Sequence, residues 1–418
     1  MIAHAHLLIT LALLFGFFMA WGVGANDVAN AMGTSVGSKV LSIKQAIIIA
    51  ALFEAGGALL ASGQVTSTIR NHIIDVHWLA HTPELFVFGM MAALFSAGIW
   101  LAAATYFGWP VSTTHTIIGA LVGFGAVGLG FNAVHWDVVS RIVLSWFVTP
   151  IFSGIVGYLL FMSVYHLILN AERSFEKAQR YLPVYLFFVV FLLSLTTLVK
   201  GLQHVGWSLT LMQEVAMAAV LGLSGSGLGV VLLRRIRIQP DAHRKVVSAA
   251  IERAFGVLTV FTACGVAFAH GSNDVANAIA PLDAIIDVVR TGSVMSHKAG
   301  VPMWILSVGA VGIIVGLATC GYRVIATIGS EITLLTPSRA FSAQLATAGT
   351  VVLASGFGLP VSTTQTLVGA VLGVGCARGM GAVNFRVIGN VFASWLITLP
   401  VGAVMSIGFF YLLRTLLG

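Results

Sequence analysis

The sequence predicts an all-α, polytopic membrane protein of about 12 membrane segments, arranged as two inverted repeats with interrupted helices or re-entrant hairpins. Of the 418 residues, 58% are hydrophobic and 8% are charged, whereas soluble domains carry about 25% charged residues. The apolar runs are continuous, unlike the alternating ten-residue strands of a β-barrel. A polar string, Asn-Asp-Val-Ala-Asn, occurs twice within apolar surroundings. The last observation is the one that predicts the repeat.

Each membrane segment is predicted from an apolar run long enough to enter the hydrocarbon core. The first run lacks a basic segment before it and leads directly into a polar motif, so we interpret it as a retained helix and not a signal peptide. The run at 252–290 is long and interrupted. The predicted segments are 5–31, 43–62, 84–107, 110–130, 138–168, 181–200, 211–233, 252–290, 302–322, 340–356, 360–376 and 387–414.

The basic residues orient these segments. With the N-terminus outside, 15 of the 21 lysines and arginines fall on the inner side, as the positive-inside rule favours. The polar segments 170–180 and 234–246 are among these inner loops, and we expect the second to contact anionic lipid headgroups. Because the positive charge is spread over short loops, the net charge of +7 does not indicate a nucleic-acid partner.

Three pairs of similar segments define a duplication. Asp27 and Asp274 stand in the same string at an offset of 247, and "GWPVSTTHTIIGALVGFG" from Gly108 matches "GLPVSTTQTLVGAVLGVG" from Gly358 at an offset of 250. A weaker pair, "SWFVTP" and "SWLITLP", follows in the same order. We predict a first repeat at 1–168, a connector with two membrane helices at 169–250, and a second repeat at 251–418. The two copies enter the membrane from opposite sides, which is typical of secondary transporters.

The "PVSTT" strings predict an anion site. A proline suits the first turn of a helix, and hydroxyls there join unpaired backbone N–H groups and the positive end of the helix dipole. Ordinary helix caps are the alternative for one such string, but two copies related by the repeat favour a site. The candidate anion ligands are Ser112, Thr113, Thr114, Ser362, Thr363 and Thr364.

The Asn-Asp strings predict a cation site. An aspartate at membrane depth costs roughly 2.5–3.5 kcal/mol and therefore usually has a function. Carboxylate and amide oxygens suit a hard cation such as Na⁺, which Asp27 and Asp274 could hold, or a proton. Flanking glycines such as Gly24 and Gly271 could open the helix there. The alternative is a structural hydrogen-bond network. The candidate cation-coupling residues are Asp27, Asn30, Asp274, Asn277 and Glu54.

Charge balance links the two sites. Neither motif contains lysine or arginine, so a bound oxyanion needs accompanying cations, which predicts cotransport with Na⁺ or H⁺. A carboxylate can accept a hydrogen bond from a P–OH group but would repel sulfate, which favours phosphate. A sulfate or other oxyanion permease is the alternative. A channel would not need the duplicated aspartates, and an enzyme would need an asymmetric catalytic set. Glycine-rich strings such as 225–229 lack the P-loop lysine, so we predict no nucleotide and no cofactor.

The strings "GANDVANAMGTSVGSKVL", "GSNDVANAIAP", "PVSTTHTIIGALVG" and "PVSTTQTLVGAVLGVG" closely resemble the signature segments of the inorganic phosphate transporter (PiT) family. The resemblance implies a phosphate symporter that couples to Na⁺ or H⁺, works by alternating access in the cytoplasmic membrane, and could form a homodimer. In some members protons drive the transport of metal–phosphate complexes, and a few similar proteins carry sulfate.

The resemblance also assigns roles to residues. It implies that Asn26, Asp27, Asn273 and Asp274 lie at the substrate and cation centre, and that the six hydroxyl residues contact phosphate. His270 directly precedes the second motif and is expected to support it. The chain departs from the family where His115 follows the threonines of one copy and Gln365 those of the other. A symmetric role for two histidines is therefore not expected.

Overall fold

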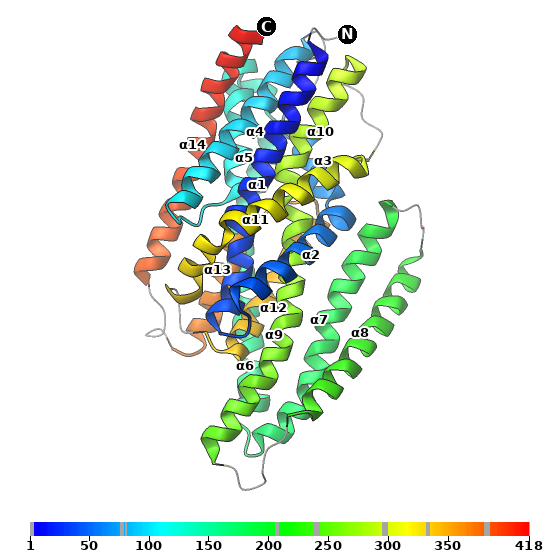
Figure 1. Ribbon diagram of the computed structural model, residues 1–418, viewed down its shortest axis with the longest axis vertical. Helices are drawn as coiled ribbons and strands as arrows, with labels where there is room; N and C mark the ends of the chain where they lie inside the picture. Colours follow the sequence, from blue (N-terminus) through cyan, green and yellow to red (C-terminus); the bar gives the residue numbers. More distant parts are fainter. Residues whose placement is uncertain are drawn as a thin grey trace.

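The computed structural model describes residues 4–75, 79, 82–204, 209–236, 243–294, 300–331, 335–379 and 385–417. The described chain is helical, and the predicted all-α, polytopic fold class is confirmed (Figure 1). The helices are α1 (Ala5–Gly37), α2 (Ile43–Ala61), α3 (Gly63–Asn71), α4 (Pro83–Tyr106), α5 (Thr113–Phe124), α6 (Trp136–Val164), α7 (Ser174–His204), α8 (Leu211–Arg234), α9 (Arg244–Asp274), α10 (Ala276–Thr291), α11 (Met303–Glu331), α12 (Pro337–Gly356), α13 (Thr363–Cys376) and α14 (Phe385–Leu417). Short π-helical turns at Gly125–Leu129 and Tyr165–Leu169 follow α5 and α6, and a 3-10 turn lies at Phe131–Ala133.

Each of the predicted membrane segments falls on a helix. Within the described ranges, nine helices are long and apolar enough to cross a membrane, counting α9 and α10 as one span. The helices α5 and α13 are apolar but shorter, at 12 and 14 residues. About 20 residues are needed to cross the hydrocarbon core. Each of these two helices is therefore too short to span the membrane by itself.

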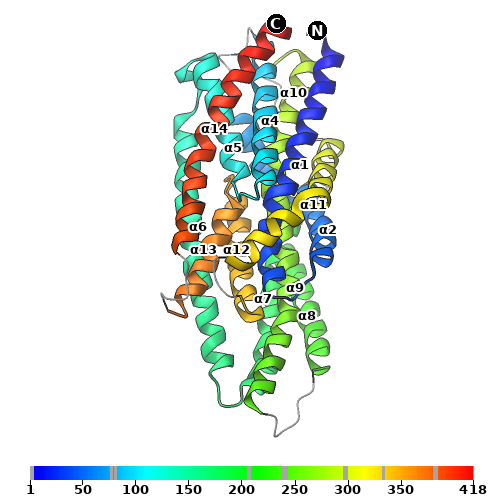
Figure 2. The same ribbon diagram turned by 60° about the vertical axis from the view of Figure 1, so that its left-hand side comes forward.

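The short helices form helical hairpins with the helices before them, α4 and α12. In Figure 2, α4 and α5 lie in the upper half of the molecule, α12 and α13 lie in the lower half, and the two hairpins point toward each other. Their turns are built alike. Gly108 (φ +68°) and Gly358 (φ +67°) end α4 and α12 in the left-handed conformation that glycine adopts without strain. Pro110 and Pro360 then lead the chain into the next helix.

The packing of the helices agrees with the predicted pair of repeats. The helix α1 packs along α11 while α9 packs along α2, and α5 packs on α14 while α13 packs on α6. Each contact thus has a counterpart with the two halves exchanged. In Figure 1, α1 runs downward from the N-terminus whereas α9 runs upward into α10. The helices α7 and α8 pack against each other on one side of the molecule. The domain boundaries proposed from the sequence stay a prediction.

The glycines beside the Asn-Asp strings serve a different purpose from the one expected. A Cβ atom at Gly24 would lie 1.9 Å from the backbone oxygen of Ile313, and one at Gly271 would lie 2.2 Å from that of Glu54. The expectation that they open the helix is wrong for α1, which is helical from Ala5 to Gly37. In the second copy the helix breaks at Val275, after the aspartate. The glycines let α1 and α9 touch α11 and α2 backbone to backbone.

The two ends of the molecule differ in charge. The termini lie together at one end, and the C-terminal ends of α6 and α8 and the start of α9 lie at the other. Basic residues near these helix ends, such as Arg173, Arg235 and Lys245, favour a cytoplasmic location for the second end by the positive-inside rule, and this orientation stays a prediction. Toward the first end, Arg70 of α3 donates hydrogen bonds to Asp283 and to Asp287 of α10, the latter at 2.5 Å.

The glycine crossings predict a specific loss of stability. Replacing Gly24 by alanine puts a methyl group into the backbone of α11, and such overpacking typically costs about 1–3 kcal/mol. We expect a clear drop in the thermal unfolding temperature of the purified protein in detergent. Gly227→Ala on α8 is the matched control, because no atom lies within 4 Å of its added Cβ. Equal unfolding temperatures for the two variants would contradict the close crossing.

Candidate functional site

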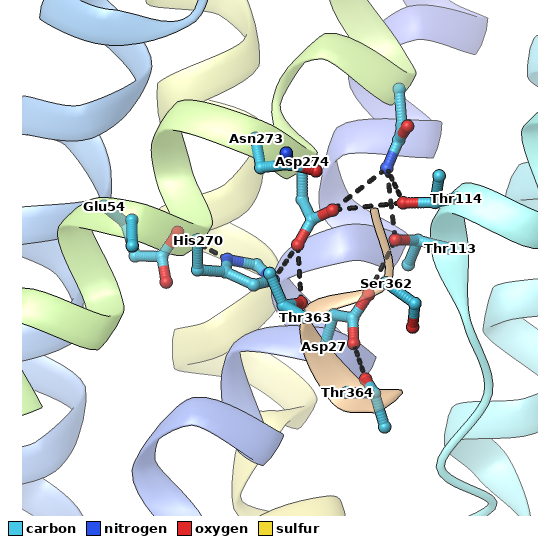
Figure 3. A network of polar contacts seen from close by, with 12 residues as sticks. Asp27, Glu54, Thr113, Thr114, His270, Asn273, Asp274, Ser362, Thr363 and Thr364 are labelled. Carbon is cyan, nitrogen blue, oxygen red and sulfur yellow. Dashed lines mark hydrogen bonds and ion pairs between the residues drawn. The ribbon is translucent and has the colours of Figure 1, made fainter. Parts of the chain in front are cut away.

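The two aspartates of the repeated string lie next to each other in the middle of the protein (Figure 3). Asp27 comes from α1 and Asp274 from the end of α9, and their side chains are 2% and 0% exposed. A carboxylate in such surroundings needs hydrogen-bond donors or cations to offset its desolvation. Threonine hydroxyls donate to both aspartates, and nitrogen atoms of His270 and Asn277 also approach Asp274.

Each carboxylate accepts hydrogen bonds from both hairpins. Thr113 of α5 donates to Oδ2 of Asp27 at 2.6 Å, and Thr364 of α13 donates to Oδ1. The second copy has the reciprocal arrangement. Thr363 donates to Oδ2 of Asp274 at 2.7 Å, and Thr114 donates to Oδ1 at 3.2 Å. Each aspartate therefore joins a threonine of its own repeat to one of the other repeat.

The hydroxyls reach the aspartates because of how α5 and α13 begin. Ser112 and Ser362 are the N-cap residues, and their Oγ atoms accept hydrogen bonds from the backbone N–H of His115 (3.2 Å) and Gln365 (3.3 Å). The threonines that follow occupy the first turn, where the helix dipole favours negative charge. The serines thus act as caps in this structure, and their direct contact with phosphate stays a prediction.

Asn26 and Asn273 hold the hairpin turns. The amide of Asn26 donates to the backbone oxygen of Trp109 at 2.9 Å, and its oxygen accepts from the N–H of Val111 at 3.2 Å. Asn273 donates to Ser355 Oγ at 2.8 Å and to the backbone oxygen of Leu359 at 3.3 Å. Both side chains fix a hairpin beside the aspartate that follows them. Their predicted contact with substrate is untested.

The second asparagine of the string faces the hydroxyls. Asn277 Nδ2 lies 3.1 Å from Thr114 Oγ1, 3.2 Å from Thr113 Oγ1 and 3.4 Å from Asp274 Oδ1. It therefore ties the start of α10 to the start of α5. Its counterpart Asn30 lies on α1, but its side chain is outside the described residues.

An imidazole makes the centre asymmetric. His270 Nδ1 lies 2.8 Å from Glu54 Oε2, and its Nε2 lies 2.8 Å from Asp274 Oδ2. All three side chains are buried. Both ring nitrogens can donate at once only when the imidazole is protonated. At the corresponding place in the first copy, 247 residues earlier, stands Val23. The structure thus brings Glu54 to the centre, through a contact across α2 and α9 that no local sequence pattern indicates.

His115 and Gln365 do not face the aspartates. The ring of His115 stacks on Trp146 at 3.8 Å between centroids, and its Nδ1 faces the backbone oxygen of Trp395 at 3.4 Å. Both residues line an apolar cavity of about 680 Å³ between α6, α13 and α14. The difference between the repeats at His115 and Gln365 therefore lies beside the aspartate centre and not within it.

The centre is acidic and rich in oxygen atoms. Ligand atoms of Asp27, His270 and Asp274 lie within 4.8 Å of one another, a spacing at which one cation could be held. The threonine hydroxyls add neutral oxygens nearby, as hard cations such as Na⁺ prefer. In the described ion pairs and hydrogen bonds, neither lysine nor arginine contacts either aspartate. An oxyanion held here would need cations beside it.

The chain matches a known protein family along most of its length. The model of the phosphate transporter family matches residues 23–406. The chain belongs to that family. The family resemblance of the repeated strings is therefore confirmed, and with it the prediction of a transporter and not an enzyme. The match and the apolar helices together make the chain an integral, multi-pass membrane protein.

Relatives and a solved structure agree with this assignment. A putative phosphate permease of Haemophilus influenzae is 49% identical over 409 residues, covering 98% of this chain and 97% of that protein. The chloroplastic inorganic phosphate transporter 2-1 of Arabidopsis thaliana is 41% identical, covering 94% of this chain and 70% of that protein. A solved structure described as the sodium-dependent phosphate transporter has a TM-score of 0.91 and 35% identity, covering 98% of this chain and 99% of that one.

The threonine hydroxyls give the site its first test. Thr114→Val keeps the shape of the side chain but removes a hydroxyl that lies 3.2 Å from both Asp274 Oδ1 and the backbone oxygen of Val361. A hydrogen bond to a charged group contributes about 1.5–3 kcal/mol, so we expect phosphate uptake to fall roughly 10- to 100-fold.

Thr116→Val is the matched control for this test. The hydroxyl of Thr116 donates to the backbone oxygen of Ser112 at 2.8 Å, within its own helix. We expect its uptake to stay near that of the unaltered protein in reconstituted vesicles. If Thr114→Val transports equally well, the hydroxyls do not belong to the transport site.

Proposed function

We propose that this protein is a secondary symporter that takes up inorganic phosphate across the cytoplasmic membrane by alternating access, coupled to Na⁺. The observation that carries the proposal is the pair of buried carboxylates, Asp27 and Asp274, each bonded to threonines of both hairpins. Membership of the phosphate transporter family supports the substrate. The coupling follows from the charges.

Cotransport follows because the centre holds negative charge before any anion arrives. Phosphate brings one or two further charges near neutral pH, and repulsion between charges is strong where water is excluded. A cation between the carboxylates removes most of this repulsion, so phosphate and cation bind better together than apart. A P–OH group of phosphate can also donate a hydrogen bond to a carboxylate oxygen, whereas sulfate has no such group near neutral pH. A sulfate permease is therefore the weaker alternative.

Sodium is the coupling ion that the oxygen-rich centre suits best. The carboxylates of Asp27 and Asp274 and the nearby hydroxyls are hard ligands, and the solved structure that matches is described as sodium-dependent. Protons are the second candidate. His270 favours them, because it lies between Glu54 and Asp274 and can carry a proton between the two carboxylates.

Alternating access requires the two hairpins to move apart in turn. The bonds Thr114–Asp274 and Thr364–Asp27 join the halves, whereas Thr113–Asp27 and Thr363–Asp274 lie within them. We propose that the bonds between halves break and re-form as one repeat rocks against the other. A homodimer, which the family resemblance implies, is also part of the proposal.

Radiolabelled phosphate uptake into proteoliposomes tests the function. Imposed Na⁺ and H⁺ gradients are applied separately, with excess sulfate as competitor. We expect accumulation driven by Na⁺ and unaffected by sulfate. Asp27→Asn and Asp274→Asn should each lower it at least about tenfold, because each removes a charge that binds the coupling ion.

Asp137→Asn is the control, since Asp137 is exposed and pairs only with Arg141 among the described ion pairs. Accumulation driven by H⁺ alone would transfer the coupling role to Glu54 and His270. Competition by sulfate would favour the oxyanion permease, and no accumulation under either gradient would contradict symport altogether.

A further inference from the structure

A basic cavity lies at the cytoplasmic end of the molecule, apart from the aspartate centre. It has a volume of about 610 Å³ and opens where α8 ends and α9 begins. Its lining contains Arg235 and Ile236 on one side and residues of α9 on the other. The lining residues of α9 are Lys245, Val246, Ala249, Ala250 and Arg253.

The helical repeat explains the shape of this cavity. Lys245, Ala249 and Arg253 are spaced by four residues and therefore lie on one face of α9. The alanine between the two long basic side chains leaves a hollow, and Arg235 at the end of α8 faces it. Three cationic groups thus surround a space that small side chains leave open.

None of the described ion pairs joins an acidic side chain to the basic residues that line the cavity. Glu252, next to Arg253, accepts hydrogen bonds from Ser338 N and Oγ at 2.9 and 2.8 Å. Glu176 pairs with Arg173 at 3.7 Å. Within the described residues, the ion pairs include none of the three basic residues that line the cavity. A ligand that fits there carries negative charge.

The position of the cavity identifies the ligand. It lies at the end of a membrane-spanning helix, α8, whose apolar side chains Leu228 and Val231 are 51% and 53% exposed. A molecule with its charge in the cavity and an apolar part along α8 would match both surfaces. Basic pockets on the cytoplasmic side of membrane helices suit the phosphate groups of lipid heads.

We propose that this cavity binds the headgroup phosphate of an anionic phospholipid, with the acyl chains lying along α8. Arg235 and Arg253 can each donate two parallel hydrogen bonds to phosphate oxygens, and Lys245 adds a point charge. The cavity is separate from the aspartate centre, since no described hydrogen bond or ion pair joins its lining residues to Asp27 or Asp274. Free phosphate has the same charged oxygens as a lipid headgroup, so the test must exclude binding of the free ion in this cavity.

Native mass spectrometry of the full-length protein tests the proposal, with phosphatidylglycerol and phosphatidylcholine added separately. We expect retained phosphatidylglycerol and little phosphatidylcholine. Each basic residue near an anionic lipid contributes about 1 kcal/mol, so Arg235→Gln, Lys245→Gln and Arg253→Gln should each weaken binding about fivefold. Ala249→Phe should also weaken it by filling the hollow without changing the charge.

The control is a triple variant, Lys177→Gln with Arg180→Gln and Arg234→Gln, which removes three charges at the same end but outside the cavity lining. It is compared with the triple variant of the lining residues, Arg235→Gln with Lys245→Gln and Arg253→Gln, which removes the same number of charges. We expect the control to keep the lipid. An equal loss of lipid binding in this control would mean that the lipid responds to general surface charge and not to the cavity, which would overturn the proposal. Displacement of the lipid by millimolar inorganic phosphate would overturn it too, because the site would then be one for the free ion.

Discussion

Two carboxylates at membrane depth must be satisfied by hydrogen bonds or cations, and this requirement organises the structure around it. Asp27 and Asp274 are buried, and neither has lysine or arginine among its described partners. Donors to both carboxylates include the first-turn threonines of α5 and α13, two apolar helices of 12 and 14 residues. Because each carboxylate takes one donor from each half, the centre exists only where the two halves meet. The hydrogen bonds that stabilise the aspartates therefore depend on how the two repeats are placed relative to each other.

Precise placement of these groups depends on backbone features nearby. Gly24 and Gly271 allow α1 and α9 to cross their neighbours at contact distance. The asparagines directly before the aspartates fasten the two hairpin turns. Each repeated string thus fixes a helix crossing, a hairpin and a carboxylate within four residues. A cation or anion entering the centre meets ligands already positioned, which lowers the entropic cost of binding.

The sequence was sufficient to predict the membrane class, the repeat and the two motif types, because apolar length, repeated strings and helix-start chemistry are local patterns. It could not predict contacts between distant segments. The pairing of Thr364 with Asp27 and the contact of His270 with Glu54 depend on how the halves interlock. The glycines were misassigned for the same reason, since a close crossing and an opened helix have the same local sequence. The predicted role of Asn30 in cation coupling remains a prediction, because its side chain lies outside the described residues.

The central claim is that the acidic centre binds phosphate only together with cations. Equilibrium binding of radiolabelled phosphate to the purified protein, measured over a series of Na⁺ concentrations at fixed pH, tests it most directly. Linkage requires that Na⁺ raise phosphate affinity and that phosphate raise Na⁺ affinity by the same factor, typically about 5- to 150-fold. We predict both effects, with both lost in Asp274→Asn. Phosphate affinity that is independent of Na⁺ and of pH would contradict the account.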